Sequence, residues 1–71
     1  MSTYASIYDV DNTPISEAVE IGSDADFAGM EIMAAEIAAS GIRCCIRWER
    51  DNDGQVAYWG ARGATLTPYW Y

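Results

Sequence analysis

Hydrophobic and polar residues alternate along two short segments near the N-terminus, residues 3–10 (TYASIYDV) and 15–21 (ISEAVEI). The first is rich in aromatic and β-branched residues, and this composition with a period of two predicts a strand. The second alternates in the same way and predicts a second strand that closes a hairpin, with Pro14 tolerated at its start. A short helix is the alternative, because Thr13 and Pro14 also suit the N-cap and the first position of a helix.

The pattern changes to a helical period over residues 24–40 (DADFAGMEIMAAEIAAS). Ser23 and Asp26 approximate a capping box, and Gly41 stands where a left-handed residue ends a helix. One face carries apolar residues at helical spacing, namely Phe27, Met30, Ala34, Ile37 and Ala38. Ile32 and Met33 lie off that face, so the helix is more apolar than packing against one core requires. Either other elements cover both sides of the helix, or Ile32 and Met33 form an apolar interface.

Residues 42–61 (IRCCIRWERDNDGQVAYWGA) predict a second hairpin around a turn at residues 51–54. The Asp-Asn-Asp-Gly sequence is typical of a type I turn followed by a left-handed glycine, as in three-residue hairpin loops. The register expected from this turn pairs Arg50 with Val56, Trp48 with Tyr58 and Arg47 with Trp59. One face of the hairpin should then pack on the helix, formed by Ile42, Cys44, Ile46, Trp48, Val56 and Tyr58. On the other face we expect a cation–π contact between Arg47 and Trp59.

These elements together predict an α+β fold, in which an antiparallel sheet packs on one main helix in a ββαββ-like order. We expect residues 1–71 to form a single small domain, because 71 residues are near the size at which one core is only just adequate. The tail, residues 64–71 (ATLTPYWY), ends in three aromatic residues. We expect these aromatic side chains to lie over the small core, and exposed interface anchors are the alternative.

Charge is divided unevenly between the two halves of the chain. The sequence has eleven Asp and Glu residues, four Arg and no Lys or His, for a formal net charge of -7. Residues 1–36 hold no basic side chain and eight of the acidic residues: Asp9, Asp11, Glu17, Glu20, Asp24, Asp26, Glu31 and Glu36. We do not expect direct binding to nucleic acid, because the chain would bring like charge to a polyanion. The expected partner is a basic protein surface, and these eight carboxylates are the expected binding residues.

One short motif points to an enzyme but lacks the residues that the enzyme needs. The order Asp9-x-Asp11-x-Thr13 after a strand resembles the haloacid dehalogenase-like phosphatases, which implies a nucleophilic carboxylate, a general acid and a phosphate-binding hydroxyl. That fold requires several crossover units of about 30 residues each, and the motif requires a distant Lys, which this chain lacks. We therefore interpret the motif as a turn and expect no enzymatic activity and no catalytic residue.

The two cysteines and the hydropathy of the chain narrow the class of protein further. Cys44 and Cys45 are adjacent, so on a strand they point to opposite faces and are expected to stay reduced. Two thiols without a histidine do not make a zinc site, and we expect no metal and no cofactor. The sequence shows no leader pattern and no apolar run near the ~18 residues of a membrane span. These features predict a cytoplasmic protein that does not bind membranes.

In size, charge and composition the chain resembles the small acidic phage-encoded anti-CRISPR proteins. The resemblance lies in the cation-free segment from Asp9 to Glu36, the helix SDADFAGMEIMAAEIAASG and the ending QVAYWGARGATLTPYWY, without a diagnostic motif. It implies an inhibitor in the host cytoplasm that blocks target-DNA binding by a type I (Cascade-type) surveillance complex through nucleic-acid mimicry. The resemblance assigns no residue roles, so the expected binding residues are taken from charge alone.

Two other functions fit the same sequence. The chain is in one case a structural or assembly protein that forms a homodimer through the helix or a sheet edge, with its acidity serving only solubility. In the other case it is an antitoxin-like inhibitor that masks a basic enzyme. Salt separates electrostatic binding from apolar assembly, because only the former weakens steeply as ionic strength rises.

Overall fold

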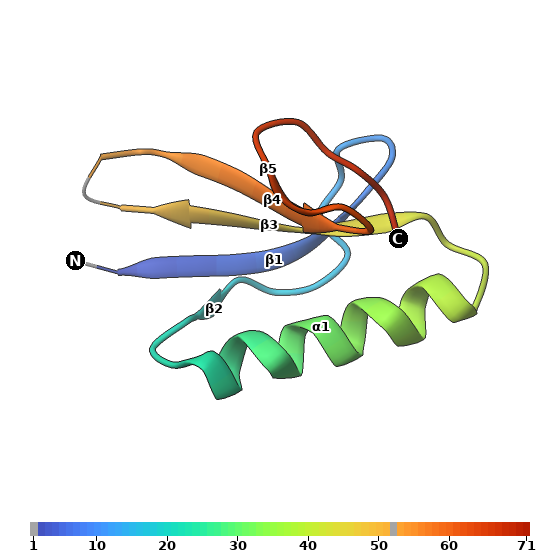
Figure 1. Cartoon of the computed structure of the whole chain (residues 1–71), viewed down its shortest axis with the longest axis horizontal. Coiled ribbons are helices and arrows are strands. Elements are labelled where there is room, and N and C mark those ends of the chain that lie inside the picture. Colours follow the sequence, from blue (N-terminus) through green and yellow to red (C-terminus); the bar gives the residue numbers. More distant parts are fainter. Residues whose placement is uncertain (1, 52) are drawn as a thin grey trace.

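An antiparallel sheet packed on a helix makes up the fold (Figure 1). Over residues 2–51 and 53–71, which the computed structural model describes, five strands form one sheet in the order β2-β1-β3-β4-β5. The elements along the chain are β1 Thr3–Asp9, β2 Val19–Glu20, α1 Asp24–Ala39, β3 Cys44–Arg50, β4 Val56–Gly60 and β5 Gly63–Thr65. The predicted α+β class is confirmed, and β5 is a strand that the sequence patterns did not indicate.

The hairpin expected at the N-terminus forms only in part. β1 pairs with β3 along its whole length, but β2 pairs with β1 only through Val19 and Glu20. In the segment before β2, the Ser16 hydroxyl accepts the Ile7 N–H at 2.9 Å. A side-chain oxygen therefore takes the place of a backbone carbonyl as the partner of β1. The predicted strand over residues 15–21 is therefore too long, and the short helix that was its alternative does not form there.

Local hydrogen bonds fix both ends of α1 as the sequence predicted. The Ser23 hydroxyl accepts the Asp26 N–H at 3.3 Å, and the Asp26 carboxylate accepts the Gly22 N–H at 2.9 Å. At the other end Gly41 has a φ of 98°, and the N–H groups of Gly41 and Ile42 donate to carbonyls of the last turn. This is a Schellman motif, in which the left-handed residue has no Cβ to strain the backbone.

The core lies between α1 and the two central strands. Its buried side chains come from β1 (Ala5, Ile7), α1 (Met30, Ala34) and β3 (Cys44, Ile46). The predicted inward face of the helix is confirmed, because Phe27, Ile37 and Ala38 pack against this cluster from the same side. In the described residues no helix is long and apolar enough to cross a membrane.

The register of the second hairpin differs from the predicted one by one residue. Ile46 lies opposite Trp59 and Trp48 opposite Ala57, because the Arg50 N–H donates to the Gln55 carbonyl at 3.0 Å. The loop is therefore one residue longer than expected, and its central residue Asn52 lies outside the described residues. Because side chains alternate between faces, the shift reverses the faces of β4.

Two expected features of β4 are corrected by this register. Trp59 belongs to the face that packs on α1, while Val56 and Tyr58 lie on the opposite face with Arg47. The expected contact between Arg47 and Trp59 is absent from the described residues. Arg47 instead lies over the ring of Tyr8, at 5.1 Å from the ring centroid, and donates to the Tyr8 hydroxyl at 3.1 Å.

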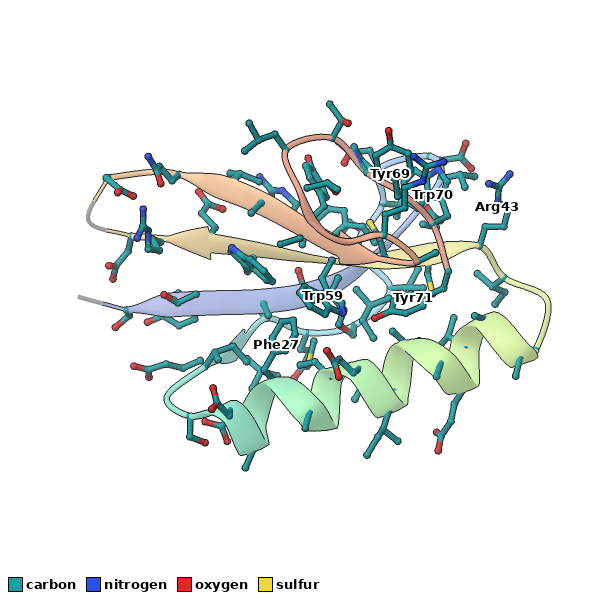
Figure 2. All side chains as sticks on the ribbon, in the orientation of Figure 1. Phe27, Arg43, Trp59, Tyr69, Trp70 and Tyr71 are labelled. Carbon is teal, nitrogen blue, oxygen red and sulfur yellow. The ribbon has the colours of Figure 1, made fainter. Side chains whose placement is uncertain are left out.

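The C-terminal tail crosses the sheet and then returns to the core. Figure 2 shows Tyr69 and Trp70 on the side of the sheet away from α1 and Tyr71 on the side of α1. The Tyr71 N–H donates to the Cys44 carbonyl at 2.9 Å, and its side chain packs against the core cluster. The expectation that the tail covers the core is thus confirmed for Tyr71, whereas Tyr69 remains 39% exposed.

Candidate functional site

A groove of about 630 Å³ lies where the start of α1 meets the sheet. This groove, called the α1 groove below, has an aromatic part formed by Phe27, Trp48 and Trp59. Figure 2 shows Phe27 of α1 and Trp59 of the sheet side by side in it. The rest of its lining comes from three places. These are the link between β2 and α1 (Ile21, Gly22 and Ser23), the first turns of α1 (Asp24, Ala28 and Glu31) and the start of β1 (Thr3). The volume falls in the range of small-ligand pockets, about 300–1,000 Å³.

The three aromatic side chains hold one another in place. Phe27 meets the ring of Trp48 at 5.2 Å between centroids and that of Trp59 at 5.3 Å, both in edge-to-face geometry. Trp48 and Trp59 come from neighbouring strands on the face toward α1, and their centroids lie 6.2 Å apart. Each edge-to-face pair adds about 0.5–1.5 kcal/mol beyond the burial of area, so the aromatic part of the α1 groove is preformed.

Asp24 and Glu31 are the charged residues that line the α1 groove. They are seven residues apart, which places them two turns apart on one side of the helix. In the part of the chain that the structure describes, neither forms an ion pair, and the lining includes no basic side chain. The α1 groove is therefore apolar inside and negative at its border.

Two N–H groups at the N-terminus of α1 already donate to side chains of the protein itself. The Ser23 hydroxyl accepts the Asp26 N–H, and the Asp26 carboxylate accepts the Gly22 N–H. Asp24 and Asp26 also place two carboxylates in the first turn, where they oppose the positive end of the helix dipole. The local charge thus favours a cation over an anion.

The eight predicted binding carboxylates do not form one continuous face. Along β1, Asp9 stands at the end that pairs with Cys44, while Glu20 pairs with Tyr4 near the other end. These ends are separated by about 17 Å, given ~3.3 Å per residue of strand. Glu36 is about 18 Å from Asp24 along the helix axis, at ~1.5 Å per residue.

The turn after β1 uses one of these carboxylates internally. Asp9 accepts backbone N–H groups from Asp11 at 2.9 Å and from Thr13 at 3.0 Å. The residues of the phosphatase-like motif are therefore joined in a turn in which the first carboxylate holds the backbone. In the described residues, no group of three His, Cys, Asp or Glu side chains is placed to hold a metal ion.

The structure gathers a smaller acidic set at the end where β2 leads into α1. Glu20, Asp24 and Asp26 lie within seven residues of one another, and Glu31 follows along the α1 groove. Asp51 joins them through Ser2, whose N–H donates to Asp51 at 2.8 Å and whose hydroxyl donates to Glu20 at 3.2 Å. Sequence reasoning missed Asp51, because only the pairing of β1 with β3 brings this residue beside the N-terminal half. Glu17 precedes this set in the exposed segment before β2.

The two apolar helix residues singled out from the sequence are both exposed. Ile32 is 63% exposed and Met33 is 41% exposed. Glu36 is four residues from Ile32 and three from Met33, so it shares the solvent-facing side of α1 with them. Around the helix axis it lies between the two. A charged residue therefore interrupts the apolar patch that these residues would form.

The arginines are mostly engaged within the C-terminal half. Arg50 pairs with Asp53 at 3.0 Å and Arg47 approaches Glu49 at 3.7 Å. Arg62 lies over the Tyr69 ring at 4.6 Å from the centroid. Arg43 is exposed beyond the end of α1 (Figure 2). None of these contacts pairs an arginine with a carboxylate of residues 1–36.

Both thiols are free, as the sequence predicted, and both are buried. The Cys44 thiol donates to the Ala34 carbonyl at 3.4 Å on the helix side. Burial, with a smaller effect of neighbouring Cys44, raises the pKa of the Cys45 thiol to about 11. Because a thiolate is the reactive form, neither position suits nucleophilic or redox chemistry.

The fold and the α1 groove together describe a small α+β protein with an aromatic cleft and an acidic border. Comparisons with models of known protein families, with curated proteins and with solved structures found no match. The geometry and charge of this chain therefore have to indicate its function.

Proposed function

We propose that the protein is an acidic binding module without enzymatic activity, which occupies a basic surface of a nucleic-acid-binding protein. The observation that carries the proposal is the uncompensated charge of residues 1–36. Within residues 2–51 and 53–71 the two ion pairs both lie in the C-terminal half, Arg47 with Glu49 and Arg50 with Asp53. The N-terminal carboxylates therefore remain available to a cationic partner.

The mode of action that follows is competition with nucleic acid. Duplex DNA carries one negative charge per about 1.7 Å of helix axis, and a cationic groove that binds it also attracts clustered carboxylates. The set formed by Glu20, Asp24, Asp26 and Asp51, with Glu31 beside it, presents such a cluster at one end of the molecule. Charge complementarity of this kind speeds encounter and suppresses wrong partners.

The particular target that we propose is the DNA- or PAM-reading surface of a type I (Cascade-type) CRISPR surveillance complex in the host cytoplasm. The support is the resemblance in size, charge and composition to the small acidic anti-CRISPR proteins. An antitoxin-like inhibitor of another basic enzyme would use the same acidic surface. The pull-down described below distinguishes the two by the identity of the protein recovered.

A second candidate function is homodimeric assembly through α1. The observation that favours it is the exposure of Ile32, at 63%, on a helix whose other solvent-facing residues include Met33 and several alanines. Such a dimer would persist at high salt, and Ile32→Asp would split it. Sedimentation at low and high ionic strength would detect it.

The test of the proposed function is recovery of a partner from a bacterial lysate that contains type I CRISPR complexes. We expect tagged protein to recover a DNA-binding effector at low salt, to lose it at high salt, and to abolish its target-DNA binding in a gel shift. A triple variant, Glu17→Lys, Glu20→Lys and Asp51→Lys, reverses charge in and beside the acidic set but outside the lining of the α1 groove. We expect it to lose recovery at least tenfold.

The matched control is Glu17→Gln, Glu20→Gln and Asp51→Asn, which keeps the size of each residue and removes only the charge. It should weaken recovery less than the Lys variant, and circular dichroism should show that both variants fold. Inhibition that survives this triple charge reversal would contradict the proposal. Recovery of the protein itself alone would favour the homodimer.

A further inference from the structure

We propose that the α1 groove receives one arginine side chain of the basic partner, with its guanidinium against the aromatic part and paired with Glu31. The inference rests on the proposed function and deepens it, because it names the side chain that an acidic module of this shape would select. Three observations carry it: the aromatic surface, the charges at the border and the absence of an internal cation from the described groove.

The aromatic part of the groove suits a planar cation. Trp48 and Trp59 are half-buried and line the open groove, so their rings are accessible to a side chain that enters from solvent. A cation within about 6 Å of such a ring centroid is attracted by its negative face, and Trp is the most favourable ring. Arg is the cation that also stacks on a ring through its own plane.

The protein makes this same contact elsewhere with its own arginines. Arg47 lies over Tyr8 at 5.1 Å and Arg62 lies over Tyr69 at 4.6 Å from the ring centroids. In the described ranges no arginine of the chain lies over Trp48 or Trp59. Two of the three tryptophan rings of the chain, the ring type most favourable for a cation, therefore line the groove without an arginine of the chain over them.

The border of the groove supplies the opposite charge. Glu31 is only partly exposed, two turns along α1 from Asp24 at the start of the helix. A guanidinium that reaches the aromatic part can pair with Glu31 through two N–H donors, a geometry that a lysine ammonium does not offer. Asp24, nearer the start of α1, adds attraction during entry.

Other occupants fit less well. An anion would meet Asp24 and Glu31 and would find the helix N-terminus already capped by Ser23. A neutral apolar side chain would fill the groove but would remove water from two carboxylates without pairing them, which is unfavourable. Charge complementarity therefore selects a cationic side chain, and the aromatic lining selects arginine among cations.

The test uses the three tryptophan indole N–H signals in ¹H–¹⁵N spectra of the whole chain. The probes are the capped peptides acetyl-Gly-Arg-Gly-amide, the same peptide with lysine, and the same peptide with citrulline, which keeps the shape of arginine without its charge. We expect saturable shifts of Trp48 and Trp59 with the arginine peptide, and binding at least fivefold weaker with either other peptide. Trp70 lies on the opposite side of the sheet (Figure 2), so its signal should not move.

Two matched variants test the role of the border. Glu31→Gln should weaken binding of the arginine peptide at least threefold, whereas Glu36→Gln on the solvent-facing side of the same helix should leave it unchanged. Ala28→Leu narrows the groove from its exposed lining while keeping a good helix former, and it should weaken binding without loss of helix in circular dichroism.

Three results would overturn the inference. These are equal binding of the citrulline peptide, equal shifts of Trp70, or equal loss of binding in Glu36→Gln and Glu31→Gln. The outcome is separable from that of the proposed function, because the charge-reversal variants of that test lie outside the groove. Arginine binding without recovery of any basic partner would leave the groove site standing and the proposed function overturned. Partner recovery that is unaffected by Ala28→Leu would leave the proposed function standing and would overturn the groove site.

Discussion

The backbone of Gly60 lies directly against the carbonyl of Tyr69, so that a Cβ on residue 60 would stand 1.6 Å from the Tyr69 oxygen. This close approach allows the tail to cross the sheet and return Tyr71 to the core. The obstacle that a larger residue would meet is backbone, which cannot move aside as a flexible side chain can. The last strand residue of β4 and the packing of the tail therefore depend on each other.

We expect Gly60→Ala to displace the tail and lower the free energy of unfolding by about 1–3 kcal/mol, the usual cost of overpacking. Urea denaturation followed by tryptophan fluorescence would measure the loss. Displacement should also increase proteolysis after Tyr69. An unchanged urea midpoint would show that the tail does not pack as described.

Gly29→Ala is the matched control and a prediction of its own. Gly29 lies within α1, and a Cβ there would meet nothing within 4 Å. Because alanine has less backbone freedom to lose and favours the helix, we expect this variant to be more stable by about 0.5–1 kcal/mol. The same urea titration checks it, and a destabilised Gly29→Ala would mean that the exposed side of α1 has a neighbour.

Phe27→Ala should both destabilise the protein and open the aromatic part of the α1 groove. Phe27 makes edge contacts with two tryptophans. Because it is only half-buried, we expect a loss of about 2–3 kcal/mol, less than the ~3–5 kcal/mol for removal of a fully buried ring. Met33→Ala is the comparison on the exposed side of the helix and should change stability by less than about 0.5 kcal/mol. Equal effects of the two would contradict the assigned helix faces.

Stability should fall in alkaline solution in part because of Cys45. Burial raises the pKa of its thiol from 9.0 to about 11 in the folded state. Between these values the unfolded chain loses a proton that the folded chain retains, so unfolding becomes more favourable by up to about 1.4 kcal/mol per pH unit. Well below pH 9 the thiol is protonated in both states and this dependence vanishes.

The measurement is the urea midpoint between pH 8 and pH 10.5 for the natural chain and for Cys45→Ala. The variant should start from a lower stability but lose less of it as the pH rises. Some dependence should remain, because burial and nearby Glu31 also raise the pKa of Tyr71. Parallel curves for the two proteins would exclude a contribution from Cys45.

Local sequence signals were sufficient wherever the decisive contact is short in range. The ends of α1 followed from Ser23, Asp26 and Gly41, because capping bonds join residues a few positions apart. The inward face of the helix followed from the 3.6-residue period, and the α+β class from the change of period along the chain. The excess of acidic residues over basic ones in the first half was read directly from composition.

The failures have two physical causes, a competing side-chain hydrogen bond and a strand too short to show a pattern. The alternation in residues 15–21 predicted a full strand, but the Ser16 hydroxyl takes the Ile7 N–H and limits the pairing to two residues. β5 was missed because it is only Gly63–Thr65, too short to show a period. In each case a competing hydrogen bond or a short length overrode the pattern.

The sequence by itself determined the helix, its caps, its buried face and the uneven charge of the two halves. Only the tertiary structure decided which side of the sheet receives Trp59, because a shift of one residue in register reverses every side chain of a strand. That choice brings Trp59 to Trp48 and Phe27 and so creates the α1 groove. The tertiary structure also decided that Asp51 lies near Glu20, through the pairing of β1 with β3. Residues so far apart in the chain meet only through the register of the strands.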